Sequence, residues 1–326
     1  MADYNDTHRA FLQVFLARGT LTYETAKPIL AAILTAADPS RETMPNDVTP
    51  QDFSDYITSL NTAVSPFDFE IRSTVPQNPY PLPDAGPSDR VYALVNTTSD
   101  PITQLATTHT PDEIAFLKRV LDHMFETANS RRTEVYAVSP TDALRLSKAP
   151  ASSQSEGSAN AGLTKSEAER CLESLVAEGW LEQSKKGFYR LSPRALMELR
   201  TWLVETYNGP QEEGSEEEEE EEETVERVKR CQGCREIVIV GQRCVDLECG
   251  VRMHDFCARN ALRAAGGGRG GDKCPGCGKG WTGEVLVGEK AAVRGRASGA
   301  SSMNGAPRRS SGAASATAEA SEEEEE

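Results

Sequence analysis

Apolar side chains in the first hundred residues are spaced as in three helices followed by two strands. Gly19 is placed to end the first helix, and Pro28 lies near the expected start of the second. Thr49 suits the N-cap position of the third helix. The buried face of this helix repeats at i, i+3, i+4 and i+7 through Phe53, Tyr56, Ile57 and Leu60. Apolar alternation then predicts strands near residues 67–71 and 90–96.

The following hundred residues repeat this plan. The segment from Thr110 to Glu113 is a strong helix start, and the segment from Thr164 to Glu167 matches a capping box. A short helix is expected at residues 140–147. Two short apolar stretches around a turn at residues 184–187 predict a hairpin, and a last helix begins at Ser192. Three helices followed by a hairpin is the order of elements in winged-helix domains.

The whole pattern predicts a multi-domain protein, mainly α-helical with small β-hairpins. Two winged-helix domains stand in tandem, the second more clearly marked than the first, and a cysteine-rich domain follows. Residues 149–162 are a low-complexity loop. The predicted boundaries are 1–105 for a winged-helix-like domain, 106–207 for a second winged-helix domain, 208–226 for an acidic linker, 227–288 for a zinc domain and 289–326 for a disordered tail.

The net charge of −16 comes mostly from two runs of glutamate. The run at residues 216–223 contributes −8 and the run at residues 322–326 contributes −5, which leaves −3 for the rest of the chain. Such runs are typically solvated and disordered. The negative net charge therefore reflects these two runs and says little about a folded binding surface.

No stretch of the sequence is suited to a membrane. The longest nearly apolar run, residues 29–37, is too short to cross a bilayer, and residues 1–10 are too polar for a secretory signal. We therefore expect a soluble intracellular protein with no membrane partner. Thiols stay reduced in that compartment, which disfavours disulfide bonds.

Eight candidate metal ligands lie within 47 residues near the C-terminus. They comprise seven of the eight cysteines and one histidine: Cys231, Cys234, Cys244, Cys249, His254, Cys257, Cys274 and Cys277. A structural zinc ion takes four nitrogen or sulfur ligands, so this set predicts two zinc ions as cofactors. All eight positions are then filled, and no site stays open for a metal-bound water. The zinc is expected to be structural because a segment this short has too small a core to fold alone.

Two pairings of these ligands fit the spacing. In the interleaved pairing, which we favour, Cys231, Cys234, His254 and Cys257 hold the first zinc, and Cys244, Cys249, Cys274 and Cys277 hold the second. A sequential pairing of the first four and the last four ligands stays open. The eighth cysteine, Cys171, lies on an apolar helix face and is expected in the core. The other histidines, His8, His109 and His123, have no ligand-spaced neighbours.

The cysteine-rich segment resembles a RING-type zinc finger with the C4HC3 ligand order. The phrase Cys244-Val-Asp-Leu-Glu-Cys249-Gly-Val-Arg-Met-His254-Asp-Phe-Cys257, followed by Cys274-Pro-Gly-Cys277, is similar to that of the non-structural maintenance of chromosomes element one family. The phrases Gly179-Trp180-Leu181 and Gly187-Phe188-Tyr189-Arg190-Leu191 resemble the second domain of that family. The resemblance covers about residues 5–285 and is strongest from residue 163 onward.

The resemblance implies a nuclear subunit of the SMC five-six DNA-repair complex. It implies a MAGE-domain subunit and other members of the complex as partners, with DNA reached only through the complex. It also implies an E3 ubiquitin ligase, which holds a ubiquitin-charged conjugating enzyme in a reactive pose. Such a ligase forms no covalent ubiquitin intermediate, so no catalytic residue is expected in this chain.

The resemblance also suggests where the conjugating enzyme would dock. Candidates for a shallow apolar groove between the zinc loops are Ile237, Val238, Leu262 and Pro275, although a buried strand explains the first two equally well. Two positions depart from active RING domains. Gly233 stands where many have an apolar contact, and Gly278 stands where many have a basic residue, with Lys279 one position late. We therefore expect weak ligase activity that the MAGE-like partner raises.

Three alternatives stay open beside the ligase. A PHD finger that reads histone tails shares the ligand order, but it usually has an aromatic residue where this chain has Asp272. A groove-reading winged helix is disfavoured because the helix at residues 164–178 carries a net charge of −2, although Lys185 and Lys186 in the hairpin turn could touch phosphate. The third alternative is a non-catalytic structural subunit.

Overall fold

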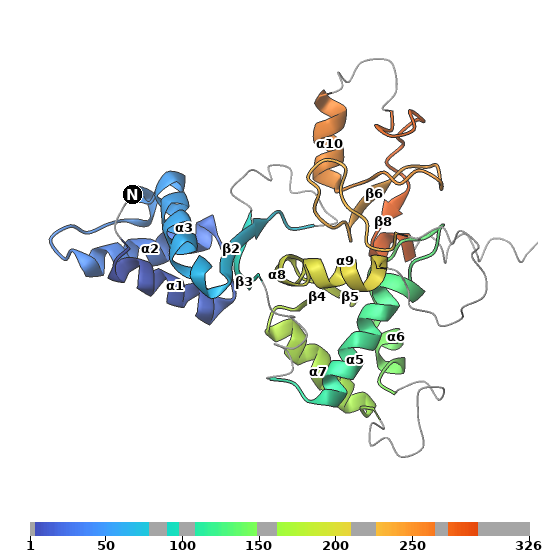
Figure 1. Cartoon of the computed structure of the whole chain (residues 1–326), viewed down its shortest axis with the longest axis horizontal. Helices are drawn as coiled ribbons and strands as arrows, with labels where there is room; N and C mark the ends of the chain where they lie inside the picture. Colours follow the sequence, from blue (N-terminus) through green and yellow to red (C-terminus); the bar gives the residue numbers. More distant parts are fainter. Residues whose placement is uncertain are drawn as a thin grey trace, which may run out of the picture.

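The computed structural model describes residues 4–77, 90–97, 108–148, 162–209, 226–264 and 273–292. These residues form a mostly helical molecule with three small sheets (Figure 1). The acidic linker, the low-complexity loop and the tail predicted from the sequence lie almost wholly outside the described residues. Within the described part, no helix is both long and apolar enough to span a bilayer.

The N-terminal unit packs three helices against a three-stranded antiparallel sheet of strand order β1-β3-β2. Its elements are α1 (Asp6–Arg18), β1 (Thr20–Thr22), α2 (Tyr23–Ala37), α3 (Pro50–Val64), β2 (Phe69–Thr74) and β3 (Val91–Asn96). The core is aromatic: the Phe11 ring makes edge contacts with Phe15, Phe53 and Tyr56. These elements are the predicted ones, apart from β1.

Local chemistry sets the helix boundaries of this unit. Gly19, at φ +72°, ends α1, and the Thr49 side chain accepts from the Asp52 N–H at the start of α3, both as predicted. The second helix differs, because Thr22 caps it in a reciprocal pair with Thr25 and Pro28 lies inside it. Pro28 is the sixth residue of α2, beyond the first four unpaired N–H groups, so it removes one helix bond, the one to the Glu24 carbonyl.

The second unit contains α5 (Pro111–Asp122), a π-helix (His123–Thr127), α6 (Pro140–Arg145), α7 (Lys165–Ala177), β4 (Leu181–Gln183), β5 (Tyr189–Leu191), α8 (Pro193–Glu198) and α9 (Arg200–Asn208). Capping boxes at Thr110 and Thr164 start α5 and α7, which confirms both predicted helix starts. The predicted last helix is in fact two helices, which meet at Leu199.

The C-terminal part consists of a three-stranded sheet of order β7-β6-β8 and one helix. Its elements are β6 (Gly241–Arg243), β7 (Arg252–Met253), α10 (Asp255–Ala264) and β8 (Leu286–Val287). In Figure 1, α8 and α9 lie between this part and the helices α5 and α7. One continuous apolar core runs from Phe116 and Leu172 of the second unit to Val228 and Val238 of the C-terminal part.

Two further junctions fix the arrangement. Met197 of α8 packs on Ala93 and Val95 of β3, which joins the N-terminal unit to the second unit. The Asn208 side chain binds the chain again after the acidic linker: its Oδ1 accepts from the N–H groups of Arg227 and Val228 at 2.9 and 2.8 Å, and its Nδ2 donates to the Val228 carbonyl at 2.9 Å. The two ends of the linker are therefore held together.

Candidate metal centre

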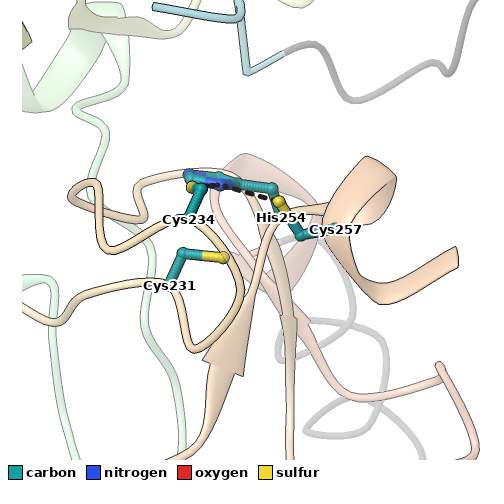
Figure 2. Close-up of side chains that lie close together, drawn as sticks. All are labelled: Cys231, Cys234, His254 and Cys257. Atoms are coloured by element: carbon teal, nitrogen blue, oxygen red, sulfur yellow. Dashed lines mark hydrogen bonds between the residues drawn. The ribbon is translucent and has the colours of Figure 1, made fainter. Parts of the chain in front are cut away.

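The first ligand group brings together two distant parts of the C-terminal segment (Figure 2). Cys231 and Cys234 stand on a turn, while His254 directly precedes α10 and Cys257 lies in its first turn. The His254 Nδ1 lies 3.3 Å from the Cys234 Sγ and 3.9 Å from the Cys257 Sγ. The four ligand atoms of Cys231, Cys234, His254 and Cys257 lie within 4.8 Å of one another.

The second ligand group consists of four cysteines from two loops. Cys244 directly follows β6, and Cys249 precedes β7; Cys274 and Cys277 lie on a turn further along the chain. The Sγ atoms of Cys244 and Cys277 are 3.5 Å apart, and those of Cys249 and Cys274 are 3.6 Å apart. All four Sγ atoms of Cys244, Cys249, Cys274 and Cys277 lie within 4.8 Å of one another.

These distances fit tetrahedral zinc. With Zn–S bonds of about 2.3 Å and Zn–N bonds of about 2.0 Å, the edges of a tetrahedron are about 3.8 Å between two sulfurs and about 3.5 Å between sulfur and nitrogen. The measured separations of 3.3 to 3.9 Å fall around these values. The grouping is the interleaved one, so the sequential pairing is not the arrangement of this structure.

Hydrogen bonds from the surrounding chain orient the ligands. The His254 Nε2 lies 3.2 Å from the Ile237 carbonyl oxygen, to which it donates when Nδ1 faces a metal. The backbone N–H groups of Gly233 and Asp246 point at the Sγ atoms of Cys231 and Cys244, at 3.4 Å each. Burial lowers the pKa of His254, but the neighbouring sulfurs outweigh it and raise the pKa to about 10. Zinc binding at this group therefore competes with protonation of His254.

Two known protein families match the sequence of this chain. Residues 8–199 match the family described as Nse1 non-SMC component of SMC5-6 complex, and residues 231–277 match a RING-like domain. The first match alone spans more than half of the chain. This protein belongs to the Nse1 family. The RING-like match begins at the first ligand, Cys231, and ends at the last, Cys277.

Known Nse1 proteins resemble this chain over most of its length. The human non-structural maintenance of chromosomes element 1 homolog is 25% identical over 285 residues, which is 87% of each chain. The Schizosaccharomyces pombe protein, named non-structural maintenance of chromosomes element 1, is 24% identical over 234 residues, 72% of this chain and 79% of its own. A solved structure described as the Nse1-Nse3-Nse4 complex has a chain that aligns with a TM-score of 0.63 and 21% identity, over 87% of this chain and 100% of that one. This last likeness shows the fold.

The structure corrects the predicted docking residues of this Nse1-family chain. Ile237 and Val238 are 2% and 0% exposed and belong to the continuous core, so they cannot line an open groove. Gln77 of the N-terminal unit covers this segment: its Nε2 donates to the Ile237 carbonyl at 2.6 Å, and its Oε1 accepts from the Ile239 N–H at 2.9 Å. Pro275 is exposed, and the Leu262 side chain lies outside the described residues.

Apolar surface is found instead beside the second ligand group. Val245 and Leu247, in the loop between Cys244 and Cys249, are each 40% exposed. Pro275 lies on the turn that carries Cys274 and Cys277, so it and the side chains of Val245 and Leu247 border the second ligand group. This exposed apolar surface has a signal in the sequence, because Val245 and Leu247 alternate with acidic residues between two ligands.

His109 also differs from the prediction, which gave it no ligand-spaced neighbour. Its ring lies between two carboxylates: Nε2 is 3.0 Å from Glu178, and Nδ1 is 3.5 Å from Glu113. The buried Cys171 completes a group of three ligand atoms, those of His109, Glu113 and Cys171, within 4.8 Å. The Glu113 carboxylate is already engaged by Thr110 in the capping box, and Glu178 accepts from Ser174. We therefore interpret this group as a clasp between α5 and α7. Cys171 lies in the core, as predicted.

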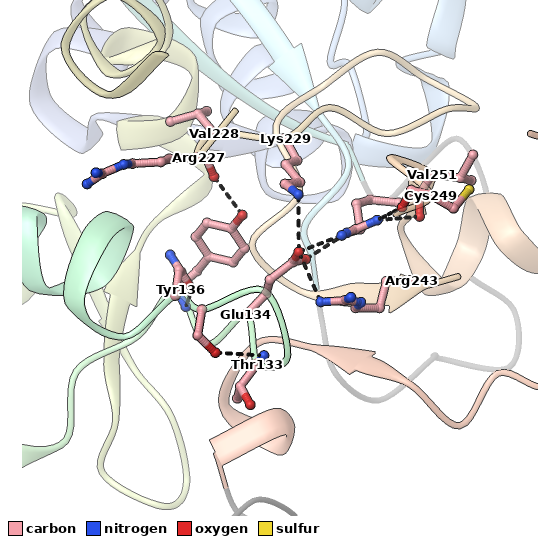
Figure 3. Close-up of polar contacts among 12 residues, drawn as sticks. Thr133, Glu134, Tyr136, Arg227, Val228, Lys229, Arg243, Cys249 and Val251 are labelled. Carbon is pink, nitrogen blue, oxygen red and sulfur yellow. Dashed lines mark hydrogen bonds and ion pairs between the residues drawn. The ribbon is translucent and has the colours of Figure 1, made fainter. Parts of the chain in front are cut away.

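A buried ion cluster, which was not predicted from the sequence, lies next to the metal centre (Figure 3). The Glu134 carboxylate, from the second unit, accepts two hydrogen bonds from Arg252 at 2.6 and 2.7 Å. It also pairs with Arg243 at 3.2 Å and Lys229 at 3.4 Å. Burial alone would raise the pKa of Glu134, but these three cations together hold that pKa below its ordinary value. Burial lowers the pKa of Arg243 and that of Lys229.

Proposed function

We propose that this protein is the Nse1 subunit of an SMC5-6 complex and that its RING-like domain, held by two zinc ions, serves as an E3 ubiquitin ligase. The observation that carries the proposal is the pair of complete four-ligand groups in an Nse1-family chain. Each group would hold one zinc ion with no open position, so the metal supplies folding energy and shape. The proposal places the protein in the nucleus and in DNA repair.

The groups that react in ubiquitin transfer all lie outside this chain. The amine of an acceptor lysine attacks the thioester carbonyl of the charged conjugating enzyme, an amide forms, and the enzyme's thiol leaves with the proton. The ligase contributes only by holding the thioester in a reactive pose. Among the described residues every cysteine is either in a ligand group or buried as Cys171 is, which agrees with a mechanism without a nucleophile.

The proposed partners are the Nse3 subunit, a MAGE protein, and the Nse4 subunit. The solved chain whose whole length aligns with 87% of this protein comes from an Nse1-Nse3-Nse4 complex. We interpret residues 1–105 and 106–207 as tandem winged-helix domains that supply the contact surface. Support comes from the order of elements, three helices and a closing pair of strands in each unit. The conjugating enzyme would dock on Val245, Leu247 and Pro275.

Two features of the second zinc loop point to a weak ligase when the protein is alone. Gly278 has φ +72°, a conformation that a basic side chain there would adopt only with strain. Lys279, the next cation, is held by Asp246 through an ion pair of 2.7 Å. The same features favour the second candidate function, a structural subunit without ligase activity. The histone-reader alternative depended on position 272, which lies outside the described residues.

The decisive assay follows the loss of ubiquitin from a charged conjugating enzyme, with free lysine as acceptor. We expect slow discharge with the isolated protein and an increase of at least about fivefold when the MAGE-type partner is added, a coupling of about 1 kcal/mol. A Val245→Asp, Leu247→Asp double variant should abolish the increase while it still binds the partner. Equal rates with and without the partner would contradict activation by the partner, and no discharge in either case would favour the structural subunit.

A charge change in the same loop tests the role of Lys279. Asp246→Asn removes its ion pair, which as an exposed pair is worth about 0.2–1 kcal/mol, so discharge should rise by up to about fivefold. The control is Glu248→Gln, which removes an exposed carboxylate of the same loop that pairs with Arg131. This control should leave the rate unchanged. A rate for Asp246→Asn equal to that of the control would exclude Lys279 from ubiquitin transfer.

A further inference from the structure

The loop at residues 129–138 belongs to the second unit and packs against the RING-like domain. It has several unusual features. It follows directly on the π-helix, a form that is rare and often found at functional sites. Tyr136 adopts φ +46°, which is uncommon for a bulky residue. Its hydroxyl donates to the Arg227 carbonyl at 2.7 Å, and its ring packs on Phe125. The loop is therefore held in a strained shape by contacts on both sides.

Glu134 is the residue of this loop whose carboxylate is buried next to the zinc-ligand loops, against Arg252. Its side chain is 4% exposed, and its backbone carbonyl accepts from the Gly288 N–H at 2.8 Å after β8. An isolated buried carboxylate is strongly disfavoured, so its position depends on the bidentate bond to Arg252. The two residues stand 118 positions apart in the sequence.

Arg252 connects this carboxylate to both ligand groups. Its Nη1 donates to the Cys249 carbonyl at 2.7 Å, beside the second group. Its backbone carbonyl accepts from the Gln232 N–H at 2.9 Å, between the two cysteines of the first group. The guanidinium and backbone of Arg252 thus touch two loops, one with Cys231 and Cys234 and the other with Cys244 and Cys249.

The buried cluster around Glu134 has more positive than negative charges. Three cations surround one carboxylate, and two nitrogens of the Arg243 side chain, Nε and Nη2, make no hydrogen bond within the described residues. With zinc bound, the first ligand group has a formal charge of −1 and the second −2, because each thiolate contributes −1 and each ion +2. Arg243 directly precedes Cys244. The excess of positive charge therefore lies beside the negative metal groups.

From these contacts we infer that Glu134 is a positioning residue for the metal centre, supplied by the second unit from outside the RING-like domain. Through Arg252 it holds the loops of both zinc groups, and it offsets part of the charge of Arg243 and Lys229. The RING-like domain is then not an autonomous module, because part of the support for its ligands comes from the loop at residues 129–138. This inference rests on the zinc occupancy proposed above.

The test measures zinc release from the full chain into an excess of a chromogenic chelator. Glu134→Gln preserves the size of the side chain but removes its charge. We expect zinc to leave at least about ten times faster than from the unaltered protein, the usual scale for loss of an outer-shell partner. The matched control is Glu236→Gln, which removes a half-exposed ion pair with Arg200 across the same two parts of the chain. This control should release zinc at the unaltered rate.

Two further variants separate positioning from a general loss of stability. Adding Arg243→Met to Glu134→Gln removes one uncompensated cation but does not restore the bidentate bond of Arg252, so zinc should still leave at least about ten times faster than from the unaltered protein. A return to the unaltered rate would show that charge alone, and not the bond to Arg252, controls zinc release. If Glu134→Gln does not fold, Arg252→Lys takes its place, because it retains the charge but loses the bidentate bond. Release as slow as in the Glu236→Gln control, from Glu134→Gln or from Arg252→Lys, would overturn the inference. An unaltered protein without two zinc ions would instead overturn the proposed function.

Discussion

Replacing one ligand of the second group, Cys249→Ser, should lower the zinc content from two ions per chain to about one. Structural zinc contributes about 10–16 kcal/mol of binding free energy in small zinc domains, so losing a tetrahedral site unfolds the loops that it holds. We expect amide hydrogen exchange to become fast around the second ligand group. The helices of the N-terminal unit, which share no core with the RING-like domain among the described residues, should keep their protection.

The matched control for this prediction is the eighth cysteine. Cys171→Ala removes a buried thiol from the core of the second unit, where neither of the two four-ligand groups depends on it. It should lower the stability of that unit by about 1–2 kcal/mol and leave two zinc ions per chain. Elemental analysis of both variants decides the matter. Two ions in Cys249→Ser, or one ion in the unaltered protein, would contradict the eight-ligand arrangement.

The second large effect is expected in the aromatic core of the N-terminal unit. Phe11 is fully buried and meets three other aromatic rings with centroid distances of 5.4 to 6.2 Å. Phe11→Ala leaves a cavity among them and should lower the free energy of unfolding by about 3–5 kcal/mol. Phe67→Ala is the control, because this ring is 73% exposed and its loss should change stability by no more than about 0.5 kcal/mol.

The positions of the tryptophans give a clear readout for this pair. Trp180, Trp202 and Trp281 all lie beyond the N-terminal unit, so their fluorescence reports on the rest of the chain. In urea, circular dichroism of Phe11→Ala should show an early transition that tryptophan fluorescence does not follow. A single coincident transition in both signals would mean that the N-terminal unit does not unfold separately.

The features predicted correctly from the sequence are those decided by neighbouring residues. The starts of α3, α5 and α7 follow from threonines that bond the backbone three residues on, a pattern visible in the sequence itself. The eight ligands are recognisable for a similar reason, since cysteines separated by two residues chelate through one turn. The interleaved pairing that we favoured is the one in the structure. The spacing alone also allowed the sequential pairing, and only the folded loops distinguish the two.

The features that were missed depend on contacts distant in sequence. Strand β1 is three residues long and forms only because β3, about seventy residues on, pairs with it. Ile237 and Val238 were offered as surface because nothing in the cysteine-rich segment shows that Gln77 and the second unit cover them. The ion cluster is equally hidden: Glu134 lies among ordinary polar residues, and its partner Arg252 is recognisable only once both are buried.

The clasp that Asn208 forms with Arg227 and Val228 changes what the connection between the units does. Since residues 208 and 227 are already adjacent in space, the chain between them does not set the distance or angle between the second unit and the RING-like domain. Doubling the length of such a closed loop costs only about 0.6 kcal/mol. Insertions, tags or even a cut in the backbone would therefore be tolerated there, and two separately made fragments would have a preformed surface on which to reassociate.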